Sequence, residues 1–83
     1  MSQNRAVITV NLLRYGVSHD LDVPLDISAY ELCQALFQKY LPDRQEGASQ
    51  YYLRSERPIA LLRGDRTLRE YGIHDGTVIN IVR

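Results

Sequence analysis

Apolar and polar residues alternate along the first part of the chain, in two runs separated by a short turn. The first run covers residues 6–13 and the second covers residues 17–23. A period of two is typical of strands with one buried face. Between the runs, Arg14-Tyr15-Gly16 supplies a turn with a glycine that tolerates positive φ. The pattern therefore predicts an antiparallel hairpin. Its core-facing residues are Ile8, Val10, Leu12, Leu21 and Val23.

The period then changes to that of a helix. Ser28 and Glu31 have the spacing of a capping box, and Pro42 lies beyond the far end of the pattern. These signals predict one helix over 29–41 and a polar loop over 42–49. The apolar stripe consists of Leu32, Leu36 and Tyr40, with Cys33, Ala35 and Phe37 at its margins.

The second half of the chain reads as short elements separated by turns. Residues 51–54 have strand composition, with Tyr52 and Arg54 on the face opposite Tyr51 and Leu53. The elements expected after this strand are a turn at 55–58, an edge-strand stub at 59–62, a one-turn helical plug at 66–73 and a last strand at 77–82.

These elements fit together in one arrangement. The helix must cover one face of the sheet to bury its stripe, and the last strand then lies beside the first, parallel to it. Ile79 and Ile81 would face the helix, and Val82 would point to the other side. We therefore predict an α+β fold of the β-grasp type, in ββαββ order, with four to five strands in a mixed sheet. Residues 1–83 would form a single domain, with 1–5 flexible.

Length, charge and composition argue against a nucleic-acid binder and against a membrane-spanning protein. A chain of 83 residues has room for one modest core, and its ten basic and ten acidic residues cancel. A nucleic-acid binder would usually show a basic excess. No apolar run reaches the roughly 20 residues that a membrane helix needs. A single cysteine fits a reducing compartment. We expect a cytoplasmic protein that binds neither nucleic acid nor membrane.

The second half resembles ubiquitin. The motif Arg-Thr-Leu-x-x-Tyr-x-Ile at 66–73, followed by Val-x-Asn-x-Val at 78–82, is similar to the C-terminal part of that fold. The bacterial YukD/EsaB type of ubiquitin-like protein shares Leu-x-Val-Pro at 21–24 and Leu-x-x-Tyr-Gly-Ile-x-Asp-Gly-x-x-Ile at 68–79. The resemblance covers 7–82. It implies a ubiquitin-like fold and a small cytoplasmic accessory component of a type VII (ESX-like) secretion system.

Two departures from ubiquitin lead us to expect a module that is not conjugated to other proteins. The given chain ends at Arg83 without the diglycine tail used in conjugation, and Lys39 stands alone against nine arginines. Two alternatives remain open. One is a small non-catalytic subunit of a multicomponent oxygenase, and the other is a ubiquitin-like modifier whose C-terminus is processed or extended.

The residue types used in catalysis and metal binding have simpler interpretations in this chain. His19 lies in the inward phase of its strand, with no metal-ligand spacing to His74 or Cys33. Cys33 sits at the margin of the helical stripe without a base beside it. Asp20 and Asp22 share an outward strand face, where a solvated surface is the usual arrangement. We therefore predict no catalytic residues, no metal and no cofactor.

Binding to other proteins, among them components of the secretion machinery, is the expected activity. The predicted site lies on the sheet face without the helix and comprises Leu13, Tyr52, Arg54 and Val82. Tyrosine and arginine are enriched among interface anchors. The arginines at 54–69 are interleaved with Glu56, Asp65 and Glu70, so a salt-bridged surface is expected there. Docking to an acidic partner is the alternative for this segment.

Overall fold

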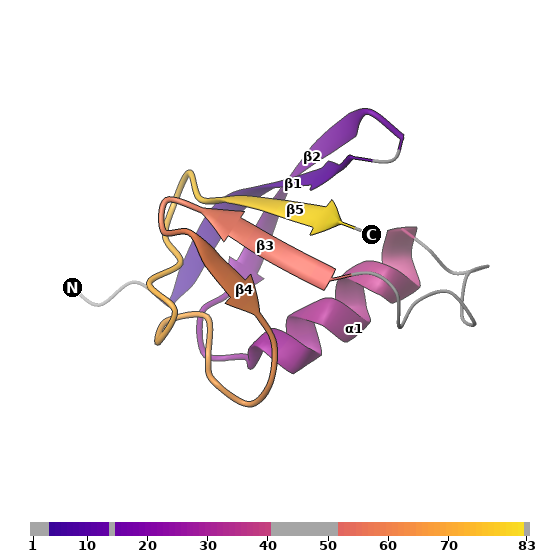
Figure 1. The fold of residues 1–83 in the computed structure, drawn as a ribbon. Coiled ribbons are helices and arrows are strands. Elements are labelled where there is room, and N and C mark those ends of the chain that lie inside the picture. The colour runs from indigo at the N-terminus through magenta and orange to yellow at the C-terminus, as the bar shows by residue number, and fades with distance from the viewer. Residues whose placement is uncertain (1–3, 14, 41–51, 83) are drawn as a thin grey trace.

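A mixed five-stranded sheet with one helix across it forms the part of the chain that the computed structural model describes, residues 4–13, 15–40 and 52–82 (Figure 1). The elements are β1 (Arg5–Leu12), β2 (Val17–Pro24), α1 (Ala29–Tyr40), β3 (Tyr52–Glu56), β4 (Ala60–Leu62) and β5 (Val78–Val82). The sheet order is β2-β1-β5-β3-β4. Strand β5 pairs with β1 in parallel, and the other neighbours are antiparallel. The predicted α+β fold and the place of the last strand are confirmed.

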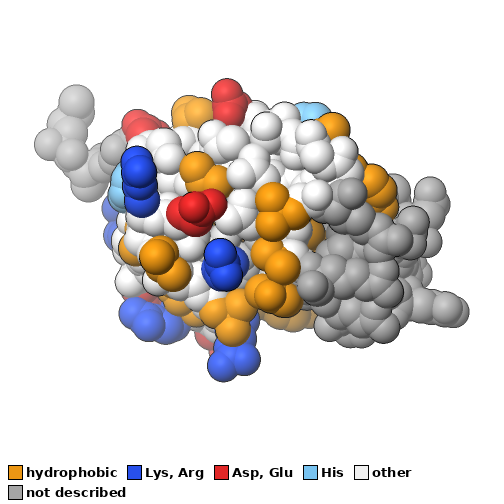
Figure 2. All heavy atoms as spheres, turned by 45° about the horizontal axis from the view of Figure 1, so that its top comes forward, with side chains coloured by type: hydrophobic (Ala, Val, Ile, Leu, Met, Phe, Trp, Pro, Cys, Tyr) orange, Lys and Arg blue, Asp and Glu red, His pale blue; other side chains and the backbone are white. Residues whose placement is uncertain are grey.

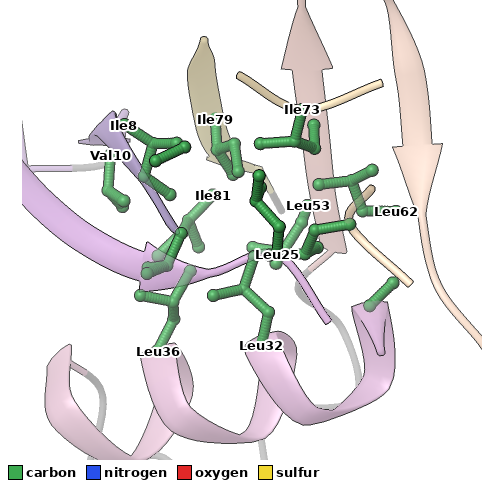
Figure 3. Close-up of a cluster of buried hydrophobic side chains, with 14 of the residues drawn as sticks. Ile8, Val10, Leu25, Leu32, Leu36, Leu53, Leu62, Ile73, Ile79 and Ile81 are labelled. Carbon is green, nitrogen blue, oxygen red and sulfur yellow. The ribbon is translucent and has the colours of Figure 1, made fainter. Parts of the chain in front are cut away.

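The core lies between the sheet and α1. Ile8 and Val10 of β1, Leu53 of β3 and Ile79 of β5 have no exposed surface. Leu32 and Leu36 point from the helix toward these side chains, as Figure 3 shows. The period of two in the strands and the spacing of four in the helix therefore bring the predicted apolar stripes into one cluster. Ala35, expected at the margin of the helical stripe, is instead exposed.

A capping box starts α1, as predicted. The backbone N–H of Glu31 donates to Ser28 Oγ at 3.1 Å, and the N–H of Ser28 donates back to Glu31 Oε1 at 3.3 Å. The other two backbone amides of the first helical turn are also hydrogen-bonded. Ala29 donates to the Arg66 carbonyl and Tyr30 to the Gly64 carbonyl. The start of the helix is thereby fixed to the segment before β5.

That segment is the predicted helical plug. Leu68 and Ile73 are buried, and the N–H of Ile73 donates to the Leu68 carbonyl while that of Gly72 donates to the Arg69 carbonyl. This pair of bonds is a Schellman ending, which needs Gly72 at its φ of 80°. Tyr71 anchors the plug by donating its hydroxyl to the Arg63 carbonyl at 2.8 Å.

A second capping box, Thr67 with Glu70, closes the start of the plug. The Thr67 N–H donates to Glu70 Oε1 at 3.0 Å, and the Glu70 N–H donates to Thr67 Oγ1 at 3.1 Å. The bonds from the Thr67 backbone and side chain lower the pKa of the Glu70 carboxyl, with a smaller contribution from Arg66.

The region of β3 and β4 departs from the predicted boundaries. Strand β3 continues through Ser55 and Glu56, which were expected in a turn, and the turn falls at 57–59. Ser55 is fully buried, and its hydroxyl is satisfied because it donates to the Pro58 carbonyl at 2.6 Å. Ile59, expected in the strand stub, lies in the turn and is 82% exposed. The stub itself is β4, so the order is ββαβββ. Tyr51 and the loop at 42–49 lie outside the described residues.

Candidate functional site

The sheet face that α1 does not cover, called the open face below, carries Tyr52, Arg54 and Val82, three of the four residues predicted to bind a partner. The fourth, Leu13, lies in the turn directly after β1. Figure 2 turns the top of Figure 1 toward the viewer and shows hydrophobic side chains gathered beside separate basic and acidic ones. Tyr52 pairs with Val82 across β3 and β5, and Leu13 directly follows β1, whose last residue pairs with Ile81. Leu13 is 55% exposed and Tyr52 40%, so the row presents apolar surface to solvent.

Arg54 stands beside this row on β3. In the register of the sheet its neighbours are Asn80 on β5 and Leu61 on β4. Arg54 is exposed and forms no ion pair with any residue that the structure describes. Leu61, which the sequence did not mark as a site residue, is 42% exposed and belongs to the same surface. No sequence signal marked it, because Ala60, Leu61 and Leu62 are all apolar.

Three hydrogen-bonded polar side chains cross the middle of the open face, and the central one, Asn80, is buried. Asn80 is only 5% exposed, although α1 covers the opposite side of β5. The Asn11 amide donates to Asn80 Oδ1 at 3.0 Å, and the Asn80 amide donates to Glu56 Oε2 at 2.7 Å. Both polar ends of Asn80 are therefore satisfied. The bond from Asn80 engages the Glu56 carboxylate, which forms no ion pair with Arg54.

The β2 side of the open face is acidic. Asp20 accepts a hydrogen bond from the Thr9 hydroxyl at 3.0 Å, and Asp22 pairs with the Arg5 guanidinium at 2.9 Å. Each carboxylate has its own partner on β1, and both side chains belong to exposed residues. This arrangement is the solvated strand face that the sequence indicated. Arg5 is also the first residue of β1, within the range 1–5 that was expected to be flexible.

His19 and Cys33, which the sequence analysis considered for metal binding and nucleophilic chemistry, each contact another residue of the fold. The His19 ring stacks on Tyr40 of α1, with centroids 5.0 Å apart and planes 17° apart. The Cys33 thiol contacts the Leu62 carbonyl at 3.6 Å, and burial raises the pKa of this thiol to about 11. A thiol in that state is a poor nucleophile. Among the described residues, no cluster of three or more histidine, cysteine or carboxylate side chains is arranged to hold a metal ion.

The arginines of 54–69 do not form the salt-bridged surface that their spacing suggested. Within the described part of the chain, the one ion pair of this group joins Arg69 to Asp26 at 3.1 Å. Arg66 instead lies over the Tyr71 ring, 5.0 Å from its centroid. The expectation was wrong because Glu56 and Glu70, two of the interleaved acids, bond to Asn80 and Thr67.

The fold and this open face define the class of protein, a ubiquitin-like β-grasp domain. The chain is similar to the N-terminal ubiquitin-like domain of the 4931431F19Rik protein, with a TM-score of 0.71, 20% identity and coverage of 98% of this chain and 76% of that one. The C-terminal ubiquitin-like domain of mouse tubulin-specific chaperone e gives a TM-score of 0.73 at 13% identity, covering 98% and 88%. The UBL domain of Plasmodium falciparum Dsk2 gives 0.59 at 11%, covering 93% and 97%. Such low identities show the shared fold alone.

Within that class, the chain belongs to the family described as "WXG100 protein secretion system (Wss), protein YukD", which it matches over residues 6–81. The resemblance that the sequence motifs indicated is confirmed. No curated protein gave a match to this chain. None of the helices in the described residues is long and apolar enough to cross a membrane.

Proposed function

We propose that this chain is a ubiquitin-like protein-binding module of the WXG100 secretion system. It acts in the cytoplasm as an accessory component and carries out no chemistry of its own. Its site is a docking patch of Leu13, Tyr52, Arg54 and Val82, with Leu61 at the margin. The observation that carries the proposal is Arg54, which is exposed beside Tyr52 and Leu61 and forms no ion pair with a described residue.

Arg54 and its surroundings are suited to protein recognition. Its guanidinium offers a planar set of donors that matches a carboxylate, and the apolar neighbours would exclude water from that pair once a partner covers them. Tyr52 supplies a large contact surface with few rotatable bonds. The secretion system comes into the proposal from the family to which the chain belongs.

The test is capture of secretion-machinery proteins from the native host. Tyr52→Asp and Arg54→Glu are each expected to reduce capture about tenfold or more, because each introduces a charge that the partner surface opposes. Gln34→Asp, at an exposed position of α1, is the matched control and should capture normally. Thermal unfolding checks that each variant is folded. Undiminished capture by both folded patch variants would show that the docking patch is wrong.

The same purified material separates the two alternatives. Co-purification with a di-iron hydroxylase would favour the oxygenase subunit, whereas co-purification with a membrane ATPase and small helical substrates of the secretion system favours our proposal. A protein modifier would appear as covalent adducts of this chain on other proteins. Intact-mass analysis of the captured proteins is expected to find unmodified partners.

A further inference from the structure

The two edges of the sheet are protected to very different extents. Strand β4 has three residues, and its end is engaged by α1 and the plug, because Cys33 contacts the Leu62 carbonyl and Tyr71 bonds to Arg63. Strand β2 has eight residues, and no strand among the described residues lies on its outer side (Figure 1). An edge of that length is a template for pairing with another chain.

The hydrogen-bond register shows which backbone groups of β2 point outward. Asn4 accepts a bond from the Leu25 N–H at 2.8 Å, so this pair is hydrogen-bonded, and alternate pairs along the hairpin are too. Residues 18, 20 and 22 belong to the intervening pairs, whose N–H and C=O groups point away from the partner strand. Strand β1 agrees with this assignment. The N–H of Thr9, which is paired with Asp20, points away from β2 and donates to the Thr77 carbonyl in the segment leading into β5.

Three successive outward amides are therefore available on β2, those of Ser18, Asp20 and Asp22. Pro24 ends this row because it has no N–H. The Asp22 carbonyl is contacted by the Arg5 guanidinium at 3.3 Å, which leaves the two carbonyls nearer the hairpin tip facing solvent. All three residues are exposed. The edge thus offers alternating donors and acceptors over about five residues, the usual length of a strand.

The side chains along this edge form two rows of different chemistry. Asp20 and Asp22 stand on the open-face side, and Asp20 forms no ion pair with a described residue. On the helix side, Val17 is 44% exposed, Leu21 is half-buried, and His19 lies flat against Tyr40. A strand laid along β2 would meet carboxylates with one set of alternate side chains and apolar or aromatic surface with the other.

We propose that the β2 edge binds an extended partner segment in which lysine or arginine alternates with apolar residues. Backbone bonds to residues 18, 20 and 22 would supply affinity, and the two rows would select the side chains. A second copy of this chain is a poor occupant, because antiparallel self-pairing about Asp20 would place its carboxylate against that of the copy. The inference is independent of the docking patch, which lies toward the other edge of the sheet.

Amide exchange measured by NMR tests the proposal on the whole chain. The probe is a soluble peptide of about seven residues that alternates lysine and valine. Exchange should slow at Ser18, Asp20 and Asp22 and stay unchanged at His19 and Leu21, whose N–H groups already bond to β1. This alternation is specific to strand addition. No effect with about 1 mM peptide would overturn the proposal.

Charge variants test the selectivity. A peptide with glutamate in place of lysine should bind at least several-fold more weakly, and Asp20→Lys should weaken the lysine peptide about tenfold. Asp65→Lys, at an exposed position in the loop after β4, is the matched control and should bind normally. Equal binding of both peptides would overturn the proposal. So would slowed exchange that grows with protein concentration in the absence of peptide, because the occupant would then be a second copy.

Discussion

The two faces of the sheet are built from the same strands but differ in chemistry. On the face under α1, Leu53, Ile79 and Val10 are aliphatic and have no exposed surface. On the open face, Arg54 and Asn80 occupy the alternate positions of β3 and β5. One face is an aliphatic layer with Ser55 as a buried polar residue on β3, and the other mixes exposed apolar residues, a buried amide and an arginine without an ion pair among the described residues.

The difference separates stability from recognition. Burial under the helix supplies most of the favourable free energy of folding, so that face tolerates few changes. The open face contributes through the hydrogen bonds of Asn80, while its apolar rim remains in solvent. Changes at that rim should alter binding more than folding. Three predictions test this division.

The largest effect is expected for Leu53→Ala on the helix side of β3. Removal of a fully buried leucine side chain should lower the free energy of unfolding by about 2–5 kcal/mol. Tyr52→Ala, one residue away on the open face, should cost less than about 1 kcal/mol. Urea unfolding of both variants measures the contrast. Equal losses would mean that the open face carries as much of the fold as the core.

The reactivity of the Cys33 thiol measures how far water and reagents enter the layer between α1 and the sheet. Its pKa is raised from 9.0 to about 11, so at neutral pH the native chain holds about a hundredfold less thiolate than the unfolded chain. Alkylation by iodoacetamide should be slower by at least that factor in the native protein than in urea. The native rate should keep rising as the pH approaches 11, whereas the unfolded rate levels off above pH 9. Similar rates in both states would show that the layer between α1 and β4 is open.

The smallest of the three effects is expected for Asn80→Ala. Its removal leaves the Asn11 amide and the Glu56 carboxylate without their partner, which should cost about 1–3 kcal/mol. Arg54→Ala, its neighbour across the strand pair, is the control and should change stability by less than about 0.5 kcal/mol. Thermal unfolding at matched pH measures both. A loss no greater than that of the control would mean that water replaces these bonds without cost.

The candidate site was partly predictable from the sequence. Alternation placed Tyr52, Arg54 and Val82 opposite the helix, because the side chains of a strand can only take two directions. It did not reveal Leu61, since a three-residue strand is too short for a period to be recognised. Nor did it reveal that the acids near Arg54 are engaged elsewhere, because hydrogen bonds across the sheet depend on register.

The sequence by itself determined the element types, the helix cap, the core-facing residues and the family. These follow from local period, turn chemistry and motifs, which act over a few residues. Only the tertiary structure decided that Asn80 is buried between Asn11 and Glu56, that Arg54 forms no ion pair with a described residue, and that β2 presents a long open edge. Each of these depends on which strands lie side by side and in what register, and such pairings join residues far apart in the chain.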